Sequence, residues 1–143
     1  MNVRRSSRLA AVAALIVLAG LIAPETARTS PVVETGYASA YSPGVMERVV
    51  MDRYRLNMWR NEPPRDPHDV DGFIAGMDCA RVGQVTTLYG PDGAAYSVLI
   101  ADCAGDDGHP DRFSDLGIIA ELDGRLWAKM TAAHGTPLEI GLR

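Results

Sequence analysis

The stretch that decides the fold is residues 96–116, with the sequence YSVLIADCAGDDGHPDRFSDL. It begins with an apolar run, residues 98–101, whose β-branched and aliphatic side chains are typical of a buried strand. The run ends at Asp102, and a loop rich in Gly and Asp leads to a second acid, Asp115, which precedes another apolar segment. Because one acid ends a buried segment and the other begins the next, we expect both carboxylates at one mouth of a small barrel.

At 143 residues the chain has room for one domain with one core. Its first 27 residues have the pattern of an export signal, with three arginines followed by an uncharged, mostly apolar run over residues 9–23. That run is shorter than the roughly 20 residues that a transmembrane helix needs. We therefore predict a signal peptide over residues 1–27, with an uncleaved signal anchor as the alternative, a linker over 28–35 and a folded domain over 36–143.

Removal of the signal would leave 11 basic and 17 acidic residues, a net charge of −6. Such a surface has no electrostatic footprint for nucleic acid. We expect a secreted or envelope protein that is monomeric, binds no nucleic acid, carries no cofactor and meets a membrane only through an N-terminal anchor.

Two cysteines, Cys79 and Cys103, give an even count behind an export signal. We predict one disulfide, which closes a loop of about 25 residues and contributes about 3–4 kcal/mol in the chain-entropy model. Two unpaired buried thiols are the alternative. Two cysteines without a second spaced pair do not make a zinc ligand set.

The loop after Cys103 is rich in oxygen ligands, which could hold Ca²⁺. Its candidate ligands are Asp106, Asp107, His109 and Asp111. Their spacing departs from that of the helix–loop–helix calcium site, so the sequence favours a solvated acidic loop and no metal.

Short apolar segments separated by turns make up the rest of the chain. Strands are expected at residues 35–41, 72–75, 84–89, 94–101 and 137–142. A short helix or irregular segment is expected within 45–59. A second helix is expected over 116–122, with Ser114 and Asp115 as its cap and Asp123-Gly124 at its end. Five or six short strands in about 110 residues indicate a small closed barrel.

Three segments carry a resemblance to a known family. Residues 36–41, GYASAY, are similar to an opening G-x-A-S/T-x-Y strand; residues 98–103, VLIADC, to a strand that ends in V-x-D; and residues 112–116, RFSDL, to an R-x-x-D-L-S segment. Over residues 36–142 the chain resembles the double-psi β-barrel domains of the rare lipoprotein A-like, expansin and barwin group. It departs from them at residues 102–105, where D-R-G-P becomes DCAG, and it lacks the His and the catalytic Glu of the rare lipoprotein A-like enzymes.

The resemblance implies a six-stranded double-psi barrel that acts on cell-wall glycan, here peptidoglycan. A lytic transglycosylase can work with one carboxylic acid, because a hydroxyl of the substrate itself attacks the anomeric carbon. Asp115 is the expected acid, and Asp102 would orient the substrate or keep Asp115 protonated as a like-charge neighbour. The alternative is a non-catalytic, expansin-like module that binds or loosens the wall, in which Asp115 caps a helix and Asp102 accepts hydrogen bonds from loop amides.

Three aromatic residues are candidates for substrate binding. Tyr37, Tyr41 and Trp59 could form a platform on which sugar rings stack, since aromatic faces suit carbohydrate rings. Burial in the core of the barrel is the alternative for each of them.

Overall fold

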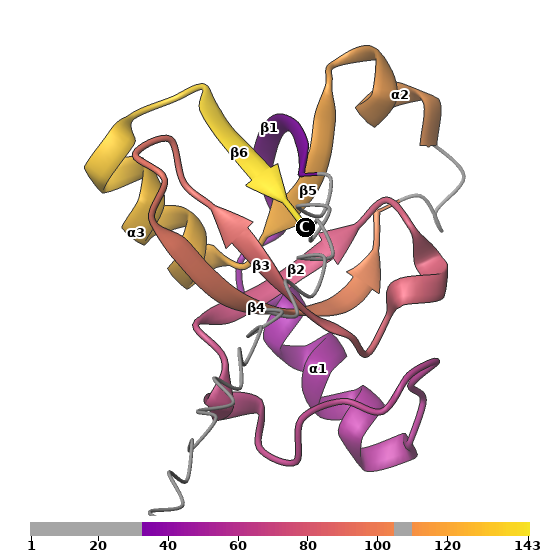
Figure 1. The fold of residues 1–143 in the computed structure, drawn as a ribbon. Helices are drawn as coiled ribbons and strands as arrows, with labels where there is room; N and C mark the ends of the chain where they lie inside the picture. The colour runs from indigo at the N-terminus through magenta and orange to yellow at the C-terminus, as the bar shows by residue number, and fades with distance from the viewer. Residues whose placement is uncertain (1–32, 105–109) are drawn as a thin grey trace, which may run out of the picture. The chain divides into compact units, whose positions relative to one another are not determined.

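A computed structural model describes residues 33–104 and 110–143. The predicted signal segment, most of the linker and the centre of the acidic loop lie outside these residues. Within them, six strands close into a barrel in the spatial order β1-β5-β2-β4-β3-β6 (Figure 1). The strands are β1 (Glu34–Ala40), β2 (Gly72–Gly76), β3 (Val85–Tyr89), β4 (Ala95–Cys103), β5 (Ile118–Leu122) and β6 (Leu138–Leu142).

Three α-helices and two short 3-10 turns connect the strands. They are α1 (Val45–Leu56), α2 (Pro110–Asp115) and α3 (Gly124–His134), with 3-10 turns at Pro67–Asp69 and Cys79–Arg81. Helices α1 and α3 lie on different sides of the barrel (Figure 1). In the part of the chain that the structure describes, no helix has the length and apolar character needed to cross a membrane.

Strand pairing in the barrel is mixed. β1 runs parallel to β5 and β2 runs parallel to β4, while the other four neighbouring pairs are antiparallel. The predicted small closed barrel is therefore confirmed, and its mixed pairing is compatible with a double-psi arrangement.

Strand β4 is central and buried, as its apolar run predicts. It pairs with β2 on one side and β3 on the other, and Val98 and Ile100 are buried in the barrel interior. Side chains between them, such as Leu99, face outward into a second apolar cluster. Helix α1 covers that cluster with Met46 and Val50, so β4 has no solvated face along this length.

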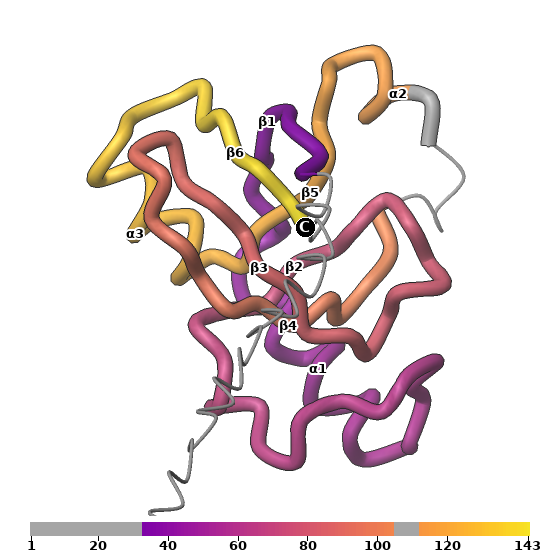
Figure 2. Tube along the Cα trace, in the orientation of Figure 1, coloured from indigo at the N-terminus to yellow at the C-terminus, as the bar shows by residue number. Residues whose placement is uncertain are grey.

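The segment before β2 holds α1 against the barrel. Helix α1 ends at Leu56, and the C-cap residue that follows it, Asn57, adopts a left-handed conformation with φ of 51°. Residues 57–71 then run along α1 before the chain enters β2 (Figure 2). The hydroxyl of Tyr54 donates a hydrogen bond of 2.6 Å to the carbonyl oxygen of Pro64 in this segment.

The predicted helix over 116–122 is wrong, because this segment forms strand β5. It pairs with β1 and β2, and Ile119, Ala120 and Leu122 are buried in the barrel. A shift in register against β1 allows two consecutive residues, Ile119 and Ala120, to face the interior. The apolar residues of this segment are spaced like those on one face of a helix, but their spacing results from the bulge in the strand. Asp115 is therefore the last residue of α2 and caps no helix that follows it.

Asp123 begins a helix instead of ending one. Its side chain is 1% exposed, and Oδ1 accepts hydrogen bonds from the backbone N–H groups of Arg125 (2.8 Å) and Leu126 (2.9 Å). These bonds make it the N-cap of α3. Its other oxygen, Oδ2, accepts a 2.6 Å bond from the backbone N–H of Phe73 in β2. One buried carboxylate thus ties α3 to the barrel wall.

The predicted disulfide between Cys79 and Cys103 is confirmed, with Cα atoms 5.0 Å apart. It joins the last residue of β4 to the 3-10 turn that follows β2, and these two strands are parallel neighbours. A disulfide is typical of proteins that fold in an oxidising compartment.

Candidate functional site

A cleft of about 420 Å³ opens beside the end of β4. It contains two acids, two aromatic rings and small side chains, which come from four different elements and the connections between them. The described residues that line it are Tyr41, Ser42, Val45, Asp102, Cys103, Ala104, Phe113 and Glu121. Asp102, one of the two acids expected together at a mouth of the barrel, is among them.

Asp102 reaches the cleft because β4 is bulged. Ile74 pairs with Ile100, but the next residue of β2, Ala75, pairs with Asp102, so Ala101 is an extra residue in β4. The bulge places Asp102 on the outer face of the barrel beside Ala75, which packs in the outer cluster.

Both oxygens of the Asp102 carboxylate have partners. The Tyr41 hydroxyl donates a 2.8 Å hydrogen bond to Oδ2, and Nη2 of Arg53 donates a 2.8 Å bond to Oδ1. The Arg53 and Asp102 side chains are only about one-fifth exposed, at 20% and 19%, so this ion pair is largely shielded from solvent. A charge-assisted pair of this kind fixes the orientation of the carboxylate.

Arg53 is a site residue that sequence reasoning missed. It lies in α1, 49 residues before its partner, and its guanidinium also lies 5.9 Å from the centre of the Trp59 ring. The family pattern has a basic residue directly after the acid, where this chain has Cys103. A long-range partner from α1 supplies a positive charge at Asp102, and no local signal in the sequence could have revealed it.

Glu121 is the second acid of the cleft, and it was also missed. In β2, Ala75 pairs with Asp102 on one side and with Glu121 of β5 on the other. Since neighbouring strands lie about 4.8 Å apart, the Cα atoms of the two acids are separated by about 10 Å across the small side chain between them. Glu121 is half-buried. The expected helix over 116–122 concealed this pairing.

Asp115 occupies a different environment. It is exposed at the end of α2 and is not among the described residues that line the cleft. The acid that the structure brings beside Asp102 is Glu121, and the role of Asp115 as proton donor stays a prediction.

The three predicted aromatic residues lie in three different environments. Tyr41 lines the cleft and contacts Asp102, as described above. Tyr37 lines a separate groove over strand β6. Trp59 is half-buried, packs against both apolar clusters and meets the Tyr54 ring edge-on at 5.0 Å. The aromatic partner of Tyr41 in the cleft is Phe113 of α2, which sequence reasoning had not singled out.

Tyr54 anchors the helix that carries Arg53. Burial raises the pKa of Tyr54 above 10.0, and the negative charges of Asp66 and Asp69 raise it further. The phenol therefore stays protonated and keeps its bond to Pro64 over the neutral pH range.

The described residues contain no group of three or more His, Cys, Asp or Glu side chains that could hold a metal ion. Asp106, Asp107 and His109 of the acidic loop lie outside these residues, and the side chain of Asp111 is also undescribed. No family model, curated protein or solved structure matches this chain.

Proposed function

We propose that this chain is an exported domain of the rare lipoprotein A-like and expansin type, which cleaves peptidoglycan in the cleft beside β4. One observation carries the proposal: Asp102 and Glu121 flank the same residue of β2 and line one cleft. Glycosidic bonds are commonly broken between two carboxyl groups. Tyr41 and Phe113 border the same cleft and offer aromatic faces to a sugar ring.

The two acids would have different tasks. Asp102 is held in one orientation by Tyr41 and Arg53, so its carboxylate is suited to face the positive charge that develops on the sugar ring. Its oxygens are already engaged, which disfavours it as a proton donor. We assign the proton donor to Glu121, the second acid that lines the cleft.

The reaction needs one proton transfer in each direction. The Glu121 carboxylic acid gives its proton to the glycosidic oxygen as the bond from that oxygen to the anomeric carbon breaks, and the leaving sugar departs as an alcohol. A hydroxyl of the remaining sugar then attacks the anomeric carbon and returns its proton to Glu121. The product is an anhydro-sugar, and no water is consumed.

Export is supported by two features. The N-terminal sequence has the pattern of a signal, and Cys79 and Cys103 form a disulfide, which persists in an oxidising compartment outside the cytoplasm. Cell-wall polymers are located in that compartment, where an exported enzyme can reach them.

A second function is favoured by the way Asp102 is bonded. Because both of its oxygens accept hydrogen bonds inside the protein, Asp102 could serve only to fix Tyr41 and Arg53 as binding groups. The domain would then bind or loosen wall polysaccharide without cleaving it, as expansins are thought to do.

The test is incubation of the full chain with purified peptidoglycan, followed by measurement of the bound fraction and of released anhydro-muropeptides by mass spectrometry. Glu121→Gln keeps the size of the side chain and removes the proton donor. Asp115→Asn makes the same change at the originally predicted acid. Glu62→Gln, at an exposed position outside the cleft, is the matched control.

We expect cleavage by the parent chain and by Glu62→Gln, at least a hundredfold loss in Glu121→Gln, and unchanged binding in all three. Loss in Asp115→Asn with full activity in Glu121→Gln would return the role of acid to Asp115. Binding without cleavage by the parent chain would establish the second function. Absence of both would overturn the glycan assignment.

A further inference from the structure

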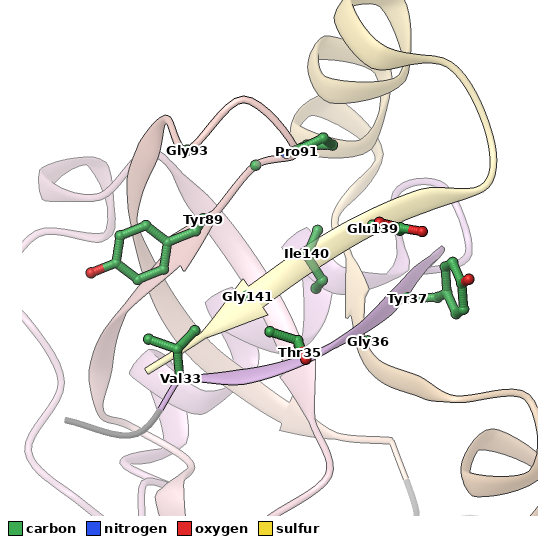
Figure 3. A pocket seen from close by; sticks show the side chains of 11 residues that line it. Val33, Thr35, Gly36, Tyr37, Tyr89, Pro91, Gly93, Glu139, Ile140 and Gly141 are labelled. Atoms are coloured by element: carbon green, nitrogen blue, oxygen red, sulfur yellow. The ribbon is translucent and has the colours of Figure 1, made fainter. Parts of the chain in front are cut away.

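A second groove, of about 470 Å³, lies on the outer face of the barrel over β1, β6 and β3. Strand β6 forms its floor, with Tyr89 of β3 on one side and Tyr37 of β1 on the other (Figure 3). The proposed cleavage site uses none of the described residues that line this groove.

Each tyrosine ring lies against a glycine. A Cβ added at Gly141 would lie 3.5 Å from Cβ and 3.6 Å from Cδ2 of Tyr89. A Cβ added at Gly117 would lie 3.5 Å from Cδ2 of Tyr37. Because glycine has no side chain, both rings rest close to the backbone; Tyr37 remains 38% exposed and Tyr89 is half-buried.

The register of the strands sets the spacing of the two rings. Tyr37 pairs with Glu139, and Tyr89 pairs with Gly141, two residues further along β6. The two tyrosines lie on the strands that flank β6, so they are two strand spacings apart across the sheet and two residues apart along it. This places their Cα atoms about 12 Å apart. One small molecule the size of a single sugar cannot contact both rings, whereas a chain of sugars can.

The chemistry of the lining favours a neutral, hydroxylated occupant. Among the described residues that line the groove, none is basic and Glu139 alone is charged. A single negative charge disfavours a polyanion as the occupant. Two tyrosines with apolar faces and polar tips, a threonine and several glycines offer the mixture of stacking and hydrogen bonding that a sugar ring uses.

Strand β1 and the residue that follows it carry one tyrosine of the groove and one tyrosine of the cleft. Tyr37, Ser39 and Tyr41 alternate with the inward-facing Ala38, so they share the outer face of this strand and its end. Tyr37 lines the groove and Tyr41 lines the cleft, four residues or about 13 Å further along. A linear polymer bound in the cleft can therefore extend along β1 to the groove.

We propose that Tyr37 and Tyr89 form an accessory subsite that holds a distal segment of the same linear glycan that enters the cleft. This inference rests on the proposed function for the identity of the polymer. The subsite adds affinity for long chains and takes no part in bond cleavage.

The test compares binding of a disaccharide and an octasaccharide of β-1,4-linked N-acetylglucosamine to the full chain by titration calorimetry. Tyr89→Ala should lower the affinity for the octasaccharide about three- to tenfold, because it removes one stacked ring, and should leave the disaccharide affinity unchanged. Tyr89→Phe keeps the ring face and should bind like the parent. Val85→Ala, an exposed change on the same strand outside the groove, is the control.

Thermal unfolding shows whether each variant is folded. If Tyr89→Ala does not fold, Tyr37→Ala provides a second test, because the side chain of Tyr37 is 38% exposed. Octasaccharide affinity that depends on Tyr89 but is unchanged in Asp102→Asn would support the subsite and contradict the cleft. The reverse pattern would support the cleft and overturn the subsite. Unchanged affinity in both tyrosine-to-alanine variants, or no octasaccharide binding at all, would also overturn the subsite and leave the groove to another occupant, such as the chain that precedes Val33.

Discussion

The buried carboxylate of Asp123 offers the sharpest test of what holds the barrel to its helices. Its Oδ1 caps α3 through two backbone N–H groups, and its Oδ2 accepts the N–H of Phe73 in β2. Asp123→Ala removes all three bonds at a position that is 1% exposed, where water does not replace them readily. Asp123→Asn keeps one acceptor oxygen, which can serve the helix or Phe73 but not both.

The expected cost follows from the two kinds of bond. Loss of an N-cap destabilises a protein by about 1 kcal/mol, and up to about 2 kcal/mol in buried settings. A buried N–H left without an acceptor, here that of Phe73, costs about 1–3 kcal/mol. Asp123→Ala should therefore lower the free energy of unfolding by about 2–5 kcal/mol. Asp123→Asn should fall between the parent and the alanine variant.

Urea unfolding monitored by tryptophan fluorescence measures this free energy, and an unchanged dependence on urea shows that the same two states are compared. Asp66→Ala is the matched control, because Asp66 caps a 3-10 turn at an exposed position, and it should cost less than about 1 kcal/mol. A loss below about 1 kcal/mol in Asp123→Ala would show that the carboxylate does not join α3 to β2 as described.

Three further predictions concern the core residue Ile100, the disulfide and the Tyr54 side chain. Ile100→Ala should lower the free energy of unfolding by about 2–5 kcal/mol in urea titrations, whereas Leu116→Ala, at an exposed side chain, should change it by less than about 1 kcal/mol. Replacing Cys79 and Cys103 together by Ser should cost about 3–4 kcal/mol, and equal stability of the oxidised and reduced parent would contradict this. Because folding raises the pKa of Tyr54, the contribution of its protonated form to the free energy of unfolding is complete below pH 10.0 and is lost as the pH rises further. In urea titrations at alkaline pH, the free energy of unfolding of Tyr54→Phe should therefore fall less steeply with pH than that of the parent.

Sequence alone predicted the elements whose pattern is local. Strand β4 contains an unbroken apolar run, residues 98–101, that ends at Asp102, and all four side chains of this run are buried. The disulfide followed from the count of cysteines and the export signal, and did not require knowledge of the fold. The closed barrel followed from the number and shortness of the strands.

Errors arose where a bulge changed the period of a strand. Ile119 and Ala120 both face the interior, so β5 lacks the alternation that identifies a strand and its apolar residues resemble a helical face. That error reversed the meaning of Asp123, which was expected to end a helix and in fact begins α3. The same error concealed Glu121 as a site residue. Glu121 pairs with Ala75, which pairs with Asp102 on its other side, and this arrangement exists only when β5 is a strand beside β2.

The order of the strands in the barrel has a consequence for how the chain folds. Among the strands that the structure describes, only β3 and β4 form a hairpin between consecutive strands; β1 pairs with β5 and β6, so that Tyr37 lies beside Ile118 and Glu34 beside Leu142. Strand β1 therefore has no partner until β5 and β6, the last two strands in the sequence, are in place. Contacts so distant in the chain favour slow folding, on a scale of about milliseconds to seconds. The β2–β4–β3 sheet can assemble early, and the docking of β1 then becomes the late step that closes the barrel and creates both the cleft and the groove.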